Sequence, residues 1–173
     1  MKQMLPARDR LQDASTADGY DGALTQLRKI HSLSETVAGL QPGDPRPVEI
    51  KLHQKSRVLE ISFDDGKSYR LSCEYLRVYS PSAEVRGHGP GQEVLQEGKK
   101  EVEINAIEPV GNYAVRLVFS DGHDTGLYSW DYLYSLGESQ PRRWQQYLEK
   151  LALAGVSREP GGKVPPESGW KKL

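Results

Sequence analysis

The sequence contains one cysteine, Cys73, among its 173 residues. A single thiol can form neither an internal disulfide nor a cysteine-rich zinc site, so the composition favours a reducing compartment, and we expect a cytoplasmic protein. Acidic and basic residues nearly balance, at 24 and 23, which leaves no basic excess of the kind that nucleic-acid binding requires. No apolar run approaches the roughly 20 residues that a membrane-spanning helix needs. These absences argue against a secreted disulfide scaffold, a nucleic-acid-binding domain and a membrane protein.

The motifs of several enzyme classes are missing as well. The chain has no nucleophile elbow, no P-loop, no dinucleotide-binding fingerprint and no H-E-x-x-H zinc motif. The glycine-rich stretch 87–91 lacks the phosphate-binding lysine of a P-loop. Cys73 is followed by Glu74, whose charge disfavours a thiolate, so we interpret the cysteine as a small buried hydrophobic residue. We therefore expect that the protein is not an enzyme.

Hydrophobic residues make up 36% of the chain, less than a compact domain normally contains, so parts of the chain are expected to lie outside a core. Residues 1–45 are predicted to form a flexible extension with one possible short helix at 22–32. Residues 46–156 are the predicted folded domain. Residues 157–173, in which proline and glycine are frequent, are predicted to be a disordered tail.

An internal repeat dominates the predicted domain. Residues 58–67 align with 114–123 without a gap, and 72–76 align with 129–133 after one extra residue in the second copy. Any two hairpins can share a turn motif, but here the turn, the residue at the expected start of a helix and a Tyr-Leu pair all align. We therefore interpret the similarity as a duplication.

Each copy is predicted to form one structural unit. An apolar strand ends at an Asp-Gly pair (65–66 and 121–122), which is typical of a tight hairpin turn. A second strand follows, and then Ser72 or Ser129 stands where the N-cap of a short helix belongs. A further alternating strand precedes each copy. The predicted fold class is α+β, with two repeated antiparallel strand–hairpin–short-helix units plus a C-terminal amphipathic helix packed on the sheet.

The C-terminal helix is predicted to begin near Ser139, with Pro141 in its first turn, and to end at Gly155. Its apolar residues recur at positions i, i+3, i+4 and i+7, and these are Trp144, Tyr147, Leu148 and Leu151. We expect this stripe to face the sheet and to belong to the core.

Two histidines are candidate metal ligands. His88 lies between the two units, and His123 follows the second Asp-Gly turn. If they approach each other beside Glu84, Asp121 or Asp124, they would form a site with two histidines and one carboxylate, of the kind that holds iron. The alternative is that both are polar turn residues hydrogen-bonded to the backbone. The sequence leaves both interpretations open.

The connection between the two units, 80–91, is longer and richer in glycine and proline than a minimal connection requires. Long ordered loops of compact domains are often functional. We therefore predict that this loop and the second Asp-Gly turn form the surface for a protein partner. The candidate residues are Ser80, Ser82, Glu84, Arg86, His88, His123 and Asp124. The alternative is a structural crossover that contacts no partner.

Three stretches, 75–89, 110–115 and 121–133, together resemble the gamma-butyrobetaine hydroxylase N-terminal-domain-like family, and in particular its stand-alone bacterial members of unknown function. The resemblance extends over about residues 45–155. Similar domains precede the catalytic oxygenase domain of carnitine-synthesis hydroxylases, and others are appended to P-loop iron–sulfur carrier proteins. The resemblance therefore implies an accessory domain.

The resemblance also implies a test for zinc, because the hydroxylase domain holds a zinc ion through three cysteines and one histidine. The corresponding positions in this chain are Ser80, Ser82, Val85 and His123. Serine hydroxyls and a valine side chain do not replace thiolates as zinc ligands. We therefore expect the hydroxylase-type zinc site to be absent, and we predict no cofactor.

Two functions follow from these observations. The first is a non-catalytic accessory domain of unknown pathway that binds an unknown protein partner, because every motif explained so far is structural. The alternative is an iron- or iron–sulfur-associated protein that uses His88 and His123. Neither function involves nucleic acid or a membrane.

Overall fold

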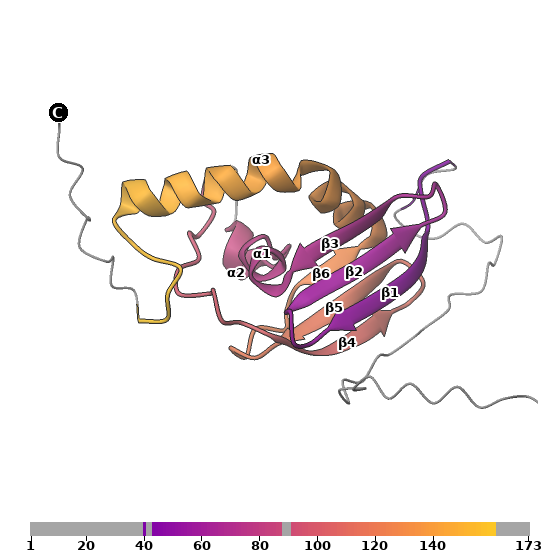
Figure 1. Ribbon diagram of the computed structural model, residues 1–173, viewed down its shortest axis with the longest axis horizontal. Coiled ribbons are helices and arrows are strands. Elements are labelled where there is room, and N and C mark those ends of the chain that lie inside the picture. Colours follow the sequence, from indigo (N-terminus) through magenta and orange to yellow (C-terminus); the bar gives the residue numbers. More distant parts are fainter. Residues whose placement is uncertain (1–39, 41–42, 88–90, 162–173) are drawn as a thin grey trace, which may run out of the picture.

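The computed structural model describes residue 40 and residues 43–87 and 91–161 (Figure 1). Within these residues lie six strands and three helices. In chain order they are β1 (Pro47–His53), β2 (Val58–Phe63), β3 (Ser68–Ser72), α1 (Cys73–Val78), α2 (Ala83–Arg86), β4 (Ile104–Val110), β5 (Ala114–Phe119), β6 (Leu127–Ser129) and α3 (Trp130–Ala154). The helix predicted at 22–32 lies outside the described residues. No described helix is both long enough and apolar enough to cross a membrane.

The strands form two three-stranded antiparallel sheets, one from each predicted unit, with the orders β1-β2-β3 and β4-β5-β6. The first strand of each sheet has a register shift near its start, between Pro47 and Glu49 in β1 and between Ile104 and Ala106 in β4. The two copies therefore share a local irregularity as well as a topology. The predicted α+β class with repeated strand–hairpin–helix units is confirmed.

The Asp-Gly turns are built alike in the two copies. The amide of Phe63 donates to the carbonyl of Lys67 at 2.8 Å, and the amide of Phe119 donates to the carbonyl of His123 at 2.9 Å. The two turn glycines have φ values of +85° and +84°, a left-handed conformation that glycine adopts at little cost. The shared Asp-Gly chemistry thus gives both hairpins the same connection.

One hydrophobic core takes residues from both sheets and from α1 and α3. In β2 the alternate residues Leu59, Ile61 and Phe63 are buried, and in β5 Leu117 and Phe119 are buried in the same way. This period of two is the one that a strand with a single buried face requires. Because the two sheets share one core, the two units form one body.

Helix α1 is short and its residues are all buried. Ser72 is its N-cap, as predicted, and the Ser72 hydroxyl accepts a hydrogen bond from the amide of Tyr75 at 3.1 Å. Cys73 is 1% exposed, and its burial raises the pKa of the thiol to about 11. The interpretation of Cys73 as a buried hydrophobic residue is confirmed.

The predicted start of the last helix near Ser139 is wrong. Helix α3 begins at Trp130 and runs for 25 residues, so the short helix of the second unit and the last helix are one element. Pro141 lies inside it, where the ring has no N–H to donate to the carbonyl of Gly137. Figure 1 shows the helix bending between the turns beside the sheets and its long C-terminal part, as an internal proline would cause. Ser139 and Pro141, which predict the start of a helix, are therefore equally compatible with a bend inside a longer helix.

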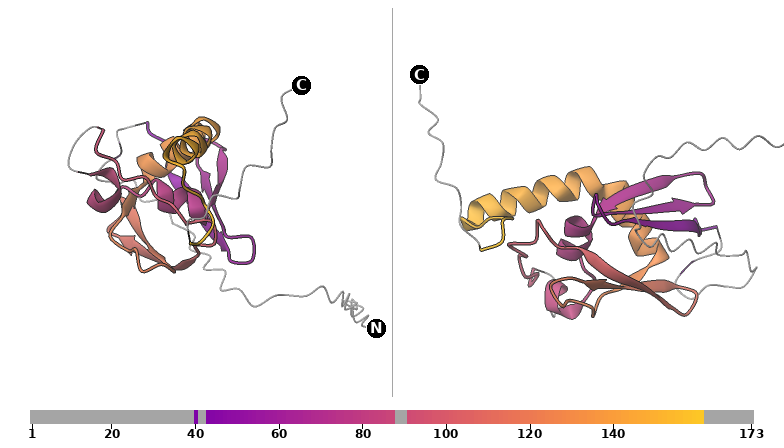
Figure 2. Two further views of the ribbon diagram at one scale, coloured as in Figure 1. Left: turned by 90° about the vertical axis from the view of Figure 1, so that its left-hand side faces the viewer. Right: turned by 60° about the horizontal axis from the view of Figure 1, so that its bottom comes forward.

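Helix α3 packs on the first sheet, as predicted, through its first half, where the ring centroid of Tyr134 lies 5.0 Å from that of Phe63. The aromatic stripe lies beyond this contact and packs on α1 instead. Tyr147 and Leu151 are buried against Val78 of α1, in a second and smaller hydrophobic cluster. Trp144 packs against both clusters, and its ring centroid lies 6.3 Å from that of Tyr75. The C-terminal half of α3 extends past the sheets and over α1 and α2 (Figures 1 and 2).

The chain after α3 returns to the domain. Gly155 ends the helix with φ +66°, as predicted. The carbonyls of Ser157 and Arg158 accept hydrogen bonds from the amides of Gly98 and Lys100 at 2.9 and 3.0 Å. We call residues 155–161 the strap. The expected domain boundary at residue 156 falls within it.

Candidate functional site

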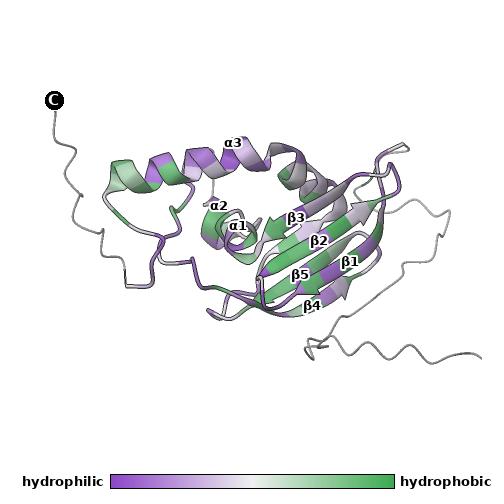
Figure 3. Ribbon diagram, viewed as in Figure 1, coloured by the Kyte–Doolittle hydropathy of each residue, from purple (hydrophilic) through white to green (hydrophobic). Residues whose placement is uncertain are grey.

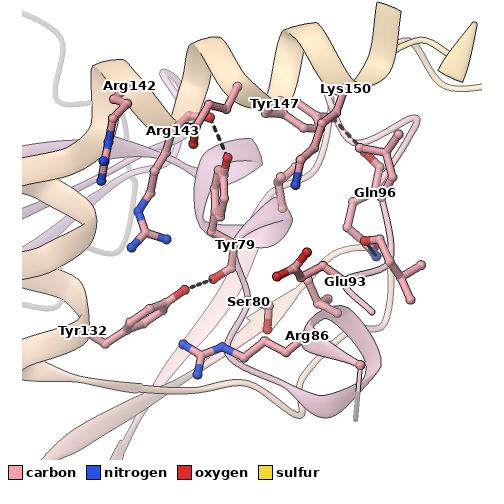
Figure 4. Close-up of a pocket in the computed structure, with 16 residues that line it drawn as sticks. Tyr79, Ser80, Arg86, Glu93, Gln96, Tyr132, Arg142, Arg143, Tyr147 and Lys150 are labelled. Atoms are coloured by element: carbon pink, nitrogen blue, oxygen red, sulfur yellow. Dashed lines mark hydrogen bonds between the residues drawn. The ribbon is translucent and has the colours of Figure 1, made fainter. Parts of the chain in front are cut away.

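A pocket of about 700 Å³ opens between the C-terminal half of α3 and the segment that connects α2 to β4 (Figure 4). Helix α3 forms one wall, and α2 with residues 93–96 forms the other. Tyr79 and Ser80, which follow α1, lie between the two walls. Four basic side chains line the cavity, and we call it the basic pocket: they are Arg86, Arg142, Arg143 and Lys150.

The helical period places the lining residues of α3 on one face. Arg143, Tyr147 and Lys150 stand at positions i, i+4 and i+7. Tyr147 is 1% exposed, and its hydroxyl donates to the carbonyl of Gln96 at 2.9 Å. This hydrogen bond ties the wall formed by α3 to the wall formed by residues 93–96, so the width of the pocket is fixed by a buried contact.

Two tyrosines hold the segment after α1 against α3. The hydroxyl of Tyr79 donates to the carbonyl of Arg143 at 2.5 Å, and the hydroxyl of Tyr132 donates to the carbonyl of Tyr79 at 2.7 Å. Tyr132 lies in the first turns of α3 and Arg143 lies in its second half. The end of α1 is therefore held to α3 at two points, one on each side of Pro141.

The same tyrosine rings support two of the arginines. The guanidinium of Arg86 lies 4.7 Å from the ring centroid of Tyr132, and that of Arg143 lies 5.5 Å from the ring centroid of Tyr79. Arg143 also donates through Nε to the hydroxyl of Ser139 at 2.7 Å. Cation–π contacts of this kind contribute about 0.5–1 kcal/mol at exposed sites. They hold each guanidinium in place before any ligand arrives.

The charges of the basic pocket are not balanced from within. In the described ranges, none of its four cations forms an ion pair with a carboxylate. Glu93 is the one acidic side chain among the described lining residues, and it is exposed. Basic side chains elsewhere in the domain are paired, as Arg77 is with Asp121 at 2.9 Å. The pocket therefore has an excess of positive charge that an anionic ligand would neutralise.

Three hydrogen-bonded side chains lie beside the pocket: Ser80 and His123 are buried, and Glu84 is exposed. The hydroxyl of Ser80 and Nε2 of His123 are 2.8 Å apart, and Nδ1 of His123 is 3.1 Å from a carboxylate oxygen of Glu84. Burial and the charge of Arg77 lower the pKa of His123 below its usual range, more than the carboxylate of Glu84 raises it. The backbone amide of Ser82 donates to the hydroxyl of Ser80 at 3.3 Å.

The order carboxylate, imidazole, hydroxyl is that of a nucleophile relay. Ser80 is 1% exposed, however, and its hydroxyl already accepts from the amide of Ser82. A nucleophile has to reach its substrate, and this hydroxyl does not reach solvent. We therefore interpret these three hydrogen-bonded side chains as a structural support. They hold α2, which carries Arg86, against the second Asp-Gly turn.

The structure separates the predicted partner residues into two groups. Ser80, Ser82 and His123 are buried, and the hydroxyl of Ser82 has no hydrogen-bond partner among the described residues. The other described candidates are Glu84 and Arg86, which are exposed, and Asp124, which lies 3.8 Å from Arg116. Ser80 and Arg86 line the pocket. His88 lies outside the described residues.

The four positions that correspond to the hydroxylase zinc ligands are all buried. Ser80 contacts His123, and Val85 and Ser82 belong to the same region of α2 and its N-terminus. In the part of the chain that the structure describes, no three histidine, cysteine, aspartate or glutamate side chains gather as a metal site. Both ring nitrogens of His123 are already in hydrogen bonds.

The sequence interpretation missed the residues of α3 that face the pocket. Arg142, Arg143 and Lys150 flank the aromatic stripe, which by itself predicts only a core contact. Their spacing, which repeats with the helical period beside buried Tyr147, was the available signal. The sequence does not show which segment faces these residues across the pocket. That segment, which includes Gln96, lies about 50 positions earlier in the chain than Tyr147.

Comparison with protein families gives a match over residues 50–134 to the model described as gamma-butyrobetaine hydroxylase-like, N-terminal. The match begins within β1, covers the other strands with α1 and α2, and ends within α3, before Arg142. A search of the curated proteins gave no significant match.

Solved structures give a similar result. One NMR solution structure is 54% identical, with 78% of this chain and 100% of that chain covered and a TM-score of 0.60. A second NMR solution structure is 46% identical, with 76% and 98% covered and a TM-score of 0.61. A crystal structure of a protein with unknown function from Acidithiobacillus ferrooxidans is 41% identical, with 55% and 98% covered and a TM-score of 0.47.

Proposed function

Because this chain belongs to the gamma-butyrobetaine hydroxylase-like N-terminal family, we propose that it is a non-catalytic accessory domain that binds an acidic segment of a partner protein in the basic pocket. The observation that carries the proposal is the set of four cations that line one pocket without a carboxylate partner among the described residues. Complementary charge is what selects a partner and speeds its encounter.

The residue types of the pocket favour a protein partner. Arginine and tyrosine are the side chains most often found at the centres of protein interfaces, together with tryptophan. Here Arg86 and Arg143 are supported by Tyr132 and Tyr79, so little freedom is lost when a ligand binds. A preformed site of this kind binds an extended segment without rearrangement of the fold.

The absence of catalysis is part of the proposal. The thiol of Cys73 is buried, with its pKa raised to about 11, and the hydroxyl of Ser80 is buried beside His123. Neither group is both activated and accessible, as a nucleophile must be. The family description supports an accessory role, because it refers to the N-terminal portion of a hydroxylase-like protein.

We also propose that the domain acts in the cytoplasm. Its single cysteine is buried and unpaired, as is common in a reducing compartment.

Binding of an acidic probe tests the proposed function. A fluorescein-labelled peptide of glutamates and glycines is titrated with the full chain, and its polarisation is measured. We expect saturable binding that weakens when the salt concentration rises from about 0.05 M to about 0.5 M. The variant Arg142→Gln, Lys150→Gln should bind about tenfold more weakly, because it removes two charged contacts from an exposed lip of the pocket.

A charge-matched variant supplies the control. Lys51→Gln, Arg70→Gln removes two positive charges from the first sheet, where both side chains are partly exposed. If the two double variants weaken binding equally, net charge alone attracts the probe and the pocket is not the site. Absence of saturable binding to the unaltered chain contradicts the proposal outright.

A further inference from the structure

The two ends of the basic pocket differ in chemistry. Figure 4 shows the side chains of Arg86 and Arg143 directed toward Tyr132, with Arg142 on the same side of the cavity. Lys150 and Gln96 lie at the other end. The positive charge is therefore concentrated at one end, where the arginines lie, and the other end has the single ammonium group of Lys150.

The end beside Gln96 combines the polar side chains of Gln96 and Lys150 with aliphatic ones. Val94 lines the pocket and is 53% exposed, and Leu95 packs against Tyr147 behind it. On α3, Leu153 follows Lys150 by three positions on the same helical face and is 89% exposed. Figure 3 shows the same change along α3, whose middle is hydrophilic and whose last turns are hydrophobic. Val94 and Leu95 therefore give this end of the pocket an aliphatic lining.

The arginine end fits carboxylates in particular. A planar guanidinium that rests on an aromatic ring leaves its N–H groups directed to the side, where they match the two oxygens of a carboxylate. Arg86 and Arg143 are both held in this way. Glu93 also lines the cavity, on the side of Gln96 and Lys150 in Figure 4, so the positive charge is least compensated at the arginine end.

We infer that the pocket recognises a segment in which a cluster of carboxylates stands next to a large apolar side chain. The carboxylates bind at the arginine end, and the apolar side chain packs on Val94 at the other end. This inference rests on the proposed function and specifies the partner that it leaves general.

Two fluorescein-labelled peptides test the inference with the full chain. Both carry the same run of glutamates; in one it is followed by a leucine and a phenylalanine, and in the other these are replaced by two serines. We expect the apolar peptide to bind about tenfold more tightly, because it covers part of the exposed aliphatic surface at the Val94 end. The advantage should survive high salt, whereas the affinity of both peptides should fall.

A matched pair of variants tests whether the tighter binding of the apolar peptide depends on Val94. In Val94→Ser the tenfold advantage of the apolar peptide should shrink to less than threefold. In Val48→Ser, which changes a valine of β1 that is 42% exposed, the full advantage should remain. Both side chains are exposed, so neither change empties the core, and thermal unfolding of each variant verifies the fold.

The outcomes separate the two claims. If neither peptide binds, the proposed function and this inference both fail. If both peptides bind the unaltered chain equally, or if the advantage persists in Val94→Ser, the inference fails and the proposed function stands. A phosphorylated peptide or a single-stranded oligonucleotide of equal length that binds more tightly than the apolar peptide also overturns the inference.

Discussion

Gly137 lies in the first half of α3, where the ring of Tyr69 packs against the helix backbone. A Cβ atom at this position would lie 2.3 Å from Cγ of Tyr69, well inside van der Waals contact. At an exposed helical site, alanine is favoured over glycine by about 1 kcal/mol. At this site the helix propensity of alanine and the clash with the ring oppose each other. The clash is the larger effect, so it decides whether the substitution stabilises or destabilises the domain.

Gly137→Ala should therefore destabilise the domain, by about 1–3 kcal/mol in urea unfolding, because the ring has to move away from the helix. In a Tyr69→Ala background the ring is gone, and the same change should stabilise. Stabilisation by Gly137→Ala in the unaltered chain would show that the ring moves aside without cost.

His123 should make stability depend on pH in a definite direction. Burial lowers the pKa of its imidazole from the ordinary value of about 6.5, so the unfolded chain binds this proton at a higher pH than the folded chain does. The contribution of His123 to stability is therefore complete above pH 6.5 and is lost as the pH falls from there through the folded pKa, at about 1.4 kcal/mol for each unit by which the pKa is lowered.

Urea unfolding between pH 7.5 and pH 5, compared for the unaltered chain and His123→Gln, measures this contribution. The unaltered chain should lose stability relative to the variant below pH 6.5, because glutamine does not titrate. The groups that face His123, which are Glu84, Asp121 and Arg77, are common to both proteins. Parallel pH profiles, or a relative gain of stability in acid, would contradict the prediction.

At the scale of elements, the strap contributes more than its composition suggests. Arg158 donates from Nε and Nη2 to the two carboxylate oxygens of Glu74, at 2.7 and 2.6 Å, and Glu74 is buried in α1. The same guanidinium lies 4.9 Å from the ring centroid of Trp144. Without the strap, a carboxylate in the interior would lose its positive partner.

A chain that ends at residue 161 should keep the stability of this contact. A chain that ends at residue 156 should lose about 1–3 kcal/mol, less than for a fully buried ion pair, because the side chain of Arg158 is 35% exposed. Replacing Glu74 by glutamine in the shorter chain should recover part of the loss, because the remaining group is neutral. Chemical denaturation of the three proteins measures the differences. Equal stability of the two chain lengths would show that the strap does not support α1.

The elements also show which kinds of signal a sequence carries. The hairpins and the start of α1 follow from chemistry within a few residues, such as an Asp-Gly pair or Ser72 as an N-cap, and they were predicted. Helix α3 was divided wrongly, because Pro141 has the same appearance in a first turn and inside a bent helix. Only the packing of Tyr79 and Tyr132 around the bend distinguishes the two.

At the scale of the molecule, the duplication gives two sheets that close one core, and this part of the architecture was accessible from the repeat. The basic pocket was accessible only in part. Arg86 and Ser80 belonged to the predicted surface, whereas the cations of α3 did not, since two walls that meet through Tyr147 and Gln96 cannot be paired from spacing alone. The connection 80–91 was predicted to be the functional segment, and its residue Arg86 lies in the pocket, while Ser82 and His123 are buried beside it.

Two separate hydrophobic clusters hold the molecule together. The larger one joins the sheets, and the smaller one, around Val78, Tyr147 and Leu151, holds α3 over the pocket. The side chains of Arg142 and Lys150 belong to neither cluster; they line the pocket and are exposed. Related domains can therefore keep the same fold and bind a different ligand when only Arg142 and Lys150 are exchanged. Amino-acid substitutions on this face of α3, rather than in the sheets, would then accompany a change of partner.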